Sequence, residues 1–129
     1  MSKMGRTQAR VDGNESGGQP MVRIVALHKR PPDPDAYIRY YLDVHMPIVQ
    51  KVPGLRKVRW GKVVSAADDS EAPCWLMSDV YFDDMHALES ALDSAEMEAA
   101  LADLANFVRD GDVQIMFCEA QDVSPLKEG

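Results

Sequence analysis

The sequence lacks the features that mark membrane proteins, secreted proteins and two large enzyme classes. No stretch of its 129 residues approaches the roughly 20 uninterrupted apolar residues that a membrane-spanning helix needs. No apolar segment before Met21 suggests a secretory signal. Glycine-rich phosphate loops and the G-x-S-x-G nucleophile elbow are absent as well. We therefore expect a cytoplasmic protein that makes no membrane contact and uses neither a nucleotide-dependent nor a serine-hydrolase mechanism.

Residues that bind metals or form disulfides are few. The two cysteines, Cys74 and Cys118, lie in apolar, strand-like runs, where a reduced cysteine usually acts as a small hydrophobic side chain. The three histidines, His28, His45 and His86, show no metal-type spacing with one another or with the cysteines. The sequence therefore predicts no metal site.

Positive charge is also scarce. The formal net charge is −7, whereas nucleic-acid binding relies on Lys and Arg to displace phosphate counterions. The one dense basic cluster, "RKVRWGK" at residues 56–62, lacks any accompanying nucleic-acid motif and is typical of a solvated strand edge. We expect no nucleic-acid partner.

The length suits one domain with a real core. Residues 1–20 carry only two large apolar side chains, Met4 and Val11, which cannot repay the entropy of ordering this segment. We therefore predict a flexible N-terminal extension over residues 1–20, a folded domain over 21–122 and a loose C-terminal tail over 123–129.

One histidine stands out in the stretch "YLDVHMPIVQKVPGLRKVRWG", residues 41–61. A strand over 21–28 precedes it, followed by a helix over 34–44 for which Asp33 is the expected N-cap. Tyr41 and His45 lie four residues apart on the buried side of this helix. Because Met46 precedes a proline, the helix is expected to end or kink around His45.

The rest of the chain predicts strands over 55–65, 74–82 and 113–120, with a helical stretch between the last two. This order predicts an α+β, ferredoxin-like split βαβ fold: a four-stranded antiparallel sheet with helices on one face. The strand over 74–82 is apolar on both sides, with Trp75, Met77 and Tyr81 on one of them. A second copy is expected to cover the open sheet face, giving a homodimeric α/β barrel with a shared interior.

The segment "YIRYYLDVHMPIVQKVPGLRKV" resembles the signature region of the EthD family, within the dimeric α/β-barrel superfamily. The shared pattern is an aromatic residue, Tyr41, four positions before His45, then Pro47 and a Pro-Gly-Leu at 53–55. "SDVYFDD" and "DLANFV" also resemble family segments, the latter with Asp103 and Phe107. This chain departs from the family in carrying Asp79 where glutamate is usual, and in its long N-terminal extension.

The resemblance implies a cofactor-free barrel whose cavity takes small hydrophobic organic compounds. Related barrels include isomerases, polyketide cyclases, dehydratases, haem-binding enzymes and monooxygenases, so the fold does not choose a reaction. The hypothesis is an acid–base enzyme acting on a small hydrophobic or aromatic carbonyl compound, with His45 and Asp79 as acid–base groups and Tyr41 as a donor to a developing oxyanion. EthD proteins are often described by their association with oxidative degradation pathways. The expectation of a catabolic, oxidoreductase-associated role is therefore inferred from such pathways, not from the residues. The expected substrate-binding residues are Trp60, Trp75, Met77 and Tyr81.

Two alternatives stay open. In the first, His45 bonds a backbone carbonyl at the helix end, Asp79 pairs with a strand arginine such as Arg59, and the tyrosines only pack. In the second, the same barrel binds a small molecule without catalysis, as a carrier or accessory protein. A haem-ligand role for His45 or a monooxygenase-type reaction is a further, less favoured possibility.

Overall fold

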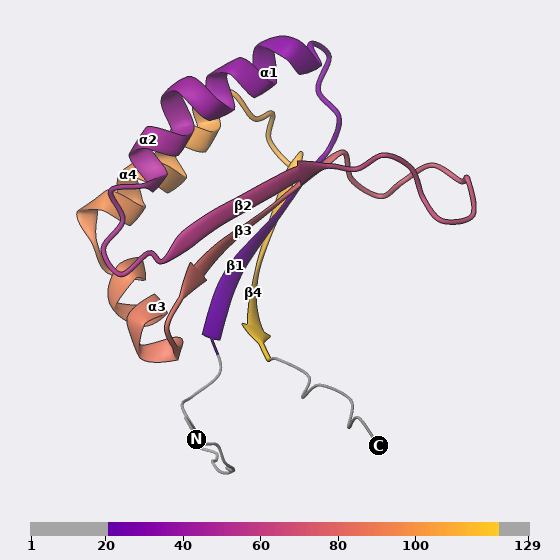
Figure 1. Cartoon of the computed structure of the whole chain (residues 1–129). Coiled ribbons are helices and arrows are strands. Elements are labelled where there is room, and N and C mark those ends of the chain that lie inside the picture. Colours follow the sequence, from indigo (N-terminus) through magenta and orange to yellow (C-terminus); the bar gives the residue numbers. More distant parts are fainter. Residues whose placement is uncertain (1–20, 122–129) are drawn as a thin grey trace, which may run out of the picture.

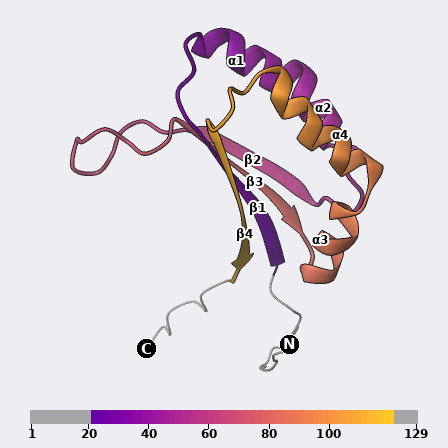
Figure 2. The same cartoon turned by 180° about the vertical axis from the view of Figure 1, so that it is seen from behind.

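The computed structural model describes residues 21–121, so the predicted extension over 1–20 and the predicted tail over 123–129 lie outside the described residues. One antiparallel sheet has the strand order β2-β3-β1-β4. Its strands are β1 (Met21–His28), β2 (Lys57–Lys62), β3 (Leu76–Phe82) and β4 (Val113–Ala120). The helices all cover one face of this sheet (Figures 1 and 2). The predicted split βαβ order is confirmed.

The first helical segment begins where the sequence predicts. The Asp33 carboxylate accepts a hydrogen bond from the Ala36 N–H at 3.1 Å, and Pro34 is the first residue of α1 (Pro34–Tyr40). Proline suits this position because the first N–H of a helix has no partner within the helix, and its fixed φ is already helical. The segment continues through a π-helical turn, η2 (Tyr41–His45), into α2 (Met46–Val49).

Of the two predicted outcomes at His45, an end of the helix is wrong, because the helix passes through Pro47. Met46 keeps helical dihedrals, φ −61° and ψ −41°, and its N–H bonds the carbonyl of Tyr41, five residues back. A proline inside a helix donates no hydrogen bond and crowds the carbonyl four residues before it. The wider π turn accommodates the proline, and it keeps Tyr41 and His45 buried on one continuous helix.

The remaining helices are α3 (Met85–Leu92), α4 (Ala95–Asp103) and the short 3₁₀ turn η3 (Leu104–Asn106). Asp84 caps α3 by accepting from the Ala87 N–H at 2.9 Å, and Ser94 caps α4 by accepting from the Met97 N–H at 3.1 Å. Aspartate and serine suit this position because their side-chain oxygens accept hydrogen bonds from N–H groups of the first helical turn. Within residues 21–121 no helix is long and apolar enough to cross a membrane.

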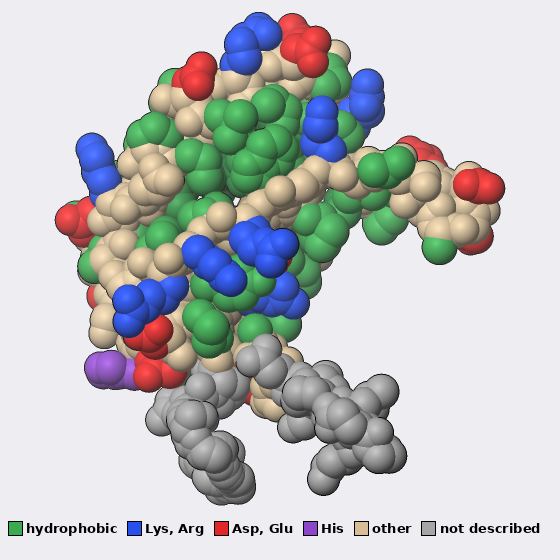
Figure 3. All heavy atoms as spheres, viewed as in Figure 1, with side chains coloured by type: hydrophobic (Ala, Val, Ile, Leu, Met, Phe, Trp, Pro, Cys, Tyr) green, Lys and Arg blue, Asp and Glu red, His purple; other side chains and the backbone are tan. Residues whose placement is uncertain are grey.

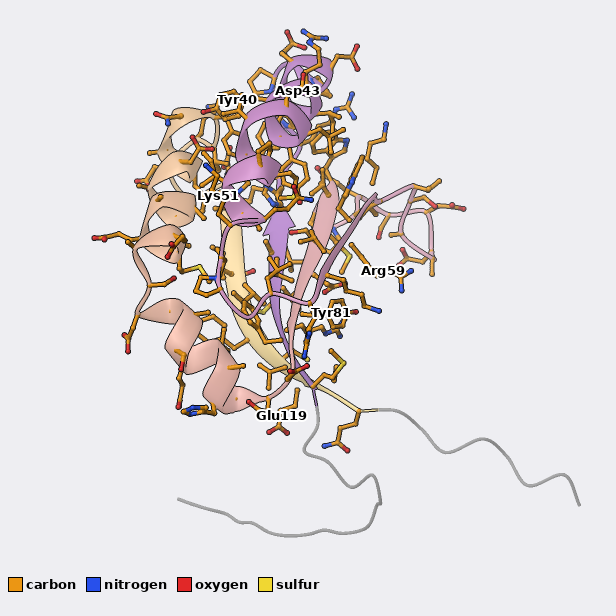
Figure 4. The ribbon with its side chains drawn as sticks, turned by 60° about the vertical axis from the view of Figure 1, so that its left-hand side comes forward. Tyr40, Asp43, Lys51, Arg59, Tyr81 and Glu119 are labelled. Atoms are coloured by element: carbon orange, nitrogen blue, oxygen red, sulfur yellow. The ribbon has the colours of Figure 1, made fainter. Side chains whose placement is uncertain are left out.

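The core lies between the helices and the sheet. Leu76, Phe82 and Leu88 are fully buried there. The opposite sheet face carries no helix and is partly apolar, with Met77 and Met116 exposed by 42% and 41%. In Figure 3, lysine and arginine side chains gather over β2 beside hydrophobic ones. In Figure 4, Arg59 and Tyr81 lie on the side of the sheet away from the helices.

Gly54 supports the turn between α2 and β2 with a φ of +82°. An alanine Cβ there would lie 3.8 Å from Phe82 Cδ2, an ordinary contact, so its cost comes from the left-handed backbone. Gly54→Ala is expected to lower the free energy of unfolding, measured in urea, by about 1–2 kcal/mol. Gly61→Ala, in β2 with open space around its new Cβ, is the control and should lose nothing. Equal stability of the two variants would contradict this account.

Candidate functional site

A small cavity of about 70 Å³ lies between the helix layer and the sheet. Its polar lining residues come from three elements: His28 at the end of β1, Tyr41 and His45 in η2, and Ser78 in β3. The other lining side chains are apolar, among them Val49, Val80, Met97, Leu101 and Ile115. The cavity therefore presents a few polar groups inside an apolar wall, which is typical of small-molecule sites.

His45 forms a buried pair with Asp103, the last residue of α4. The His45 Nδ1 lies 2.9 Å from Asp103 Oδ2, and both residues are only 6% exposed. The same carboxylate accepts from the Tyr40 hydroxyl at 2.8 Å and from the Asn106 amide at 3.0 Å. Figure 4 shows Tyr40 between the first helical segment and α4. Asp103 is thus held in place by three donors from the helix layer.

The charges of this pair follow from burial and hydrogen bonding. Burial lowers the pKa of His45, although the hydrogen bond and charge of Asp103 oppose that fall. For Asp103, burial acts to raise the pKa, but the hydrogen bonds from Asn106, His45 and Tyr40 outweigh it, so its pKa is lowered. At neutral pH the pair is therefore a neutral imidazole donating its Nδ1–H to a carboxylate. The lone pair of His45 Nε2 remains available as a base.

Tyr41 lies beside His45, with ring centroids 5.9 Å apart and ring planes 29° from parallel. The residue is 1% exposed, and its hydroxyl bonds no group within residues 21–121. Burial raises the pKa of this hydroxyl, and the nearby Ser78 side chain offsets part of the rise. Because an unpartnered buried hydroxyl is costly, it is a natural donor to a ligand in the cavity.

The predicted pairing of His45 with Asp79 is wrong. Asp79 instead accepts from Arg23 at 3.2 Å on the open sheet face, and Arg59 is its cross-strand neighbour. Successive strand residues face opposite sides of a sheet, so Ser78 faces the helices and Asp79 faces away from them. The acidic partner of His45 is Asp103, 58 residues further along the chain.

The four predicted substrate-binding residues are absent from the cavity lining. Trp60 packs edge-on against Tyr41, with centroids 5.9 Å apart, and Trp75 packs against Tyr37 at 5.6 Å. Met77 and Tyr81 lie on the open sheet face, where the Lys57 ammonium sits 4.8 Å above the Tyr81 ring. Trp75 leaves the face predicted for it because it precedes β3, where strict strand alternation no longer applies.

A larger hollow of about 650 Å³ lies beside the β2–β3 loop. It is lined by Lys29, Arg30, Glu71, Trp75 and neighbouring loop residues, and the His45–Asp103 pair lies outside its lining. Among residues 21–121 no group of three or more His, Cys, Asp or Glu side chains is arranged to hold a metal ion. The chemistry suggested by the side chains therefore concentrates in the smaller cavity.

Sequence reasoning missed Asp103, His28 and Ser78 as members of this site. Asp103 stands out in the sequence only through its place in the segment "DLANFV", which resembles the family, and nothing in that segment pairs it with His45. His28 is the last residue of the strand predicted over 21–28, a position that by itself marks no site. The partners of His28 and His45 become visible only when β1 is brought against α1, and η2 against α4.

Solved structures share this fold at low sequence identity. A dimeric ferredoxin-like protein of unknown function from Thermobifida fusca is 16% identical over 78% of this chain and 92% of its own, with a TM-score of 0.57. A hydroxynitrile lyase from Passiflora edulis is 10% identical over 84% of this chain and 100% of its own, with a TM-score of 0.64. SnoaB, a cofactor-independent oxygenase from Streptomyces nogalater, is 12% identical over 83% and 99%, with a TM-score of 0.58. These similarities establish the ferredoxin-like fold alone.

Two relatives are more similar in sequence. An uncharacterised 11.0 kDa protein from the thcB–thcC intergenic region of Rhodococcus erythropolis is 30% identical over 105 residues, which are 81% of this chain and all of the relative. An EthD family protein from Bacillus halodurans C-125 is 30% identical over 78% of this chain and 99% of its own, with a TM-score of 0.72. The EthD domain itself matches residues 29–111, which include both His45 and Asp103. The resemblance seen in the histidine segment is thereby confirmed, and the chain belongs to the EthD domain family.

Proposed function

We propose that this protein is a cofactor-independent acid–base enzyme in which His45 moves a proton on a small carbonyl compound bound in the 70 Å³ cavity. The observation that carries the proposal is the buried His45–Asp103 pair, whose histidine lines a largely apolar cavity. A histidine whose Nδ1–H is held by a carboxylate keeps its Nε2 free to accept a proton, and the carboxylate stabilises the imidazolium that forms.

The proton transfer can be followed atom by atom. His45 Nε2 accepts a proton from the carbon next to the carbonyl, and the C–H electron pair becomes the new C=C bond of an enolate. The carbonyl π electrons move to the oxygen, which accepts a hydrogen bond from the Tyr41 hydroxyl. Return of the proton from His45 to the α-carbon restores the carbonyl compound and regenerates the base. Isomerisation, dehydration and aldol-type reactions share this first step.

The cavity favours a small, uncharged substrate. Its 70 Å³ is far below the roughly 300–1,000 Å³ of pockets that take drug-sized ligands. Burying a charged group among apolar side chains is costly, so a neutral carbonyl compound fits the wall better than an anion. The lyase and the oxygenase that share the fold perform different reactions. The reaction must therefore be argued from the site residues and not from the fold.

The open sheet face suits a second copy of this chain. Met77 and Met116 are exposed on it beside the Arg23–Asp79 ion pair, and a monomer seldom leaves such an apolar face in water. A twofold arrangement of two such faces would bury these residues in a shared barrel interior. The dimeric ferredoxin-like protein from Thermobifida fusca supports this arrangement.

Placing a charge at the centre of this face should prevent association. Met77→Glu is expected to sediment as a folded monomer in analytical ultracentrifugation, because the carboxylate would be buried without a matching partner. Met85→Glu is the matched control, since Met85 is 44% exposed on α3 in the helix layer, and that variant should sediment like the unaltered protein. A dimeric Met77→Glu variant would place the interface elsewhere.

Proton exchange tests the proposed activity without knowledge of the natural substrate. Acetone, 2-butanone and acetaldehyde are incubated with the protein in D₂O, and loss of their α-proton signals is followed by ¹H NMR. Exchange faster than with buffer alone is the expected result. Binding of these compounds without faster exchange would favour the non-catalytic alternative, a barrel that carries or senses a small molecule.

A further inference from the structure

His28 is a second buried histidine in the cavity wall, and the proposed mechanism leaves it without a role. It is 1% exposed at the end of β1. Its ring meets the Tyr41 ring edge-on, with the ring centroids 5.8 Å apart. Burying a polar ring so fully is costly unless both of its nitrogens are used.

The hydrogen bond to Tyr37 decides which nitrogen of His28 carries its proton. His28 Nδ1 lies 2.6 Å from the Tyr37 hydroxyl. Within residues 21–121 that hydroxyl has no other hydrogen-bond partner, so we assign its single proton to the bond with Nδ1, which leaves no O–H donor of Tyr37 unused. A nitrogen that accepts a hydrogen bond carries no proton, so the proton of neutral His28 is on Nε2.

Burial, followed by the charge of His45, lowers the pKa of His28 to about 4. The ring is therefore neutral near pH 7 and acts as a donor without adding a positive charge to the cavity. The two histidines then have opposite tautomers: His45 is protonated on Nδ1 toward Asp103, and His28 is protonated on Nε2. One ring offers the cavity a base, and the other offers it an N–H donor.

We infer that His28 is a substrate-binding residue whose Nε2–H donates to the carbonyl oxygen of the substrate, while His45 acts on the neighbouring carbon. This inference rests on the proposed function and narrows its substrate class to small neutral ketones and aldehydes. When His45 removes the α-proton, negative charge develops on the oxygen, and His28 and Tyr41 together hold it as two donors. The proton then returns from His45 to carbon, so the step needs no oxidant or reductant.

Nitrogen NMR tests the tautomers directly. In protein labelled with ¹⁵N-histidine, long-range ¹H–¹⁵N spectra at pH 7 are expected to show Nε2–H for His28 and Nδ1–H for His45. Tyr37→Phe removes the donor to Nδ1 and is expected to give a mixture of tautomers at His28 alone. An Nδ1–H tautomer of His28 in the unaltered protein would overturn this inference while leaving the role of His45 intact.

Titration with acetone tests the contact. We expect acetone to shift the His28 Nε2–H signal. His28→Leu should weaken acetone binding by about threefold to tenfold, the loss of one hydrogen bond. His28→Gln retains an N–H donor and should bind within about twofold of the unaltered protein. Acetone shifts at His45 alone, or equal affinity of the leucine variant, would overturn the inference. The absence of any acetone binding would overturn both this inference and the proposed substrate class.

Discussion

His45→Gln is expected to lower the rate of α-proton exchange by about 10²–10⁴-fold, the usual contribution of a general base. Glutamine has a similar reach and can still donate to Asp103, so the helix layer should stay intact while the basic nitrogen is lost. The measurement is the initial exchange rate of acetone in D₂O, with circular dichroism as a check on folding.

His86→Gln is the matched control for that variant. His86 is exposed on α3, and its replacement should leave exchange unchanged. The pH profile gives a second readout. Exchange should rise with pH as His45 loses its proton, and because burial lowers the pKa of His45, the midpoint should fall below the ordinary histidine value of 6.5. Full exchange activity in His45→Gln would contradict the proposed base.

The unaltered protein is expected to lose about 3 kcal/mol of its free energy of unfolding between pH 7 and pH 4 through His28 alone. The pKa of His28 falls from 6.5 in the unfolded chain to about 4 in the folded protein, so below pH 6.5 the unfolded state binds the proton first. With respect to His28, the free energy of unfolding therefore has its full value above pH 6.5 and decreases as the pH falls toward 4. His45, whose pKa is also lowered, adds to the same trend.

Urea unfolding at a series of pH values measures this loss. His28→Leu cannot bind the proton and should flatten the curve between pH 6.5 and 4, even though it is less stable at pH 7 because the Tyr37 hydroxyl loses its partner. His86→Leu, an exposed site, should keep the full slope. A slope as steep in His28→Leu as in the unaltered protein would assign the acid sensitivity to other groups, since His45 alone accounts only for a shallower residual slope.

Local signals predicted most of the fold. Asp33, Asp84 and Ser94 are caps because their side chains reach backbone N–H groups within the next turn, an interaction that neighbouring residues alone determine. The π turn was missed because both a break and a widened turn relieve the conflict at Pro47, and the sequence does not distinguish them.

Sequence alone predicted Tyr41 and His45 as site residues, but it did not predict Asp103, His28 or Ser78. Alternation along β3 correctly separates Ser78 from Asp79, but both faces of this strand are apolar, so sequence alone does not tell which face the helices cover. The site residues were therefore expected on the wrong side of the sheet. Asp103 pairs with His45 across 58 residues of chain, and no local pattern marks such a contact.

The π turn also bears on how this segment tolerates changes in length. A π turn holds one residue more than the α turn it replaces. The segment therefore consists of two regular helices, α1 and α2, joined by a turn with one surplus residue. Removing one residue between Tyr41 and His45 would restore an ordinary α register without shortening either flanking helix. Tyr41 and His45 would then lie three residues apart, a spacing that still places both side chains on one face of an α-helix. The surplus residue therefore sets how far α2 is rotated about the helix axis relative to α1, whereas the tyrosine and the histidine share a face with or without it.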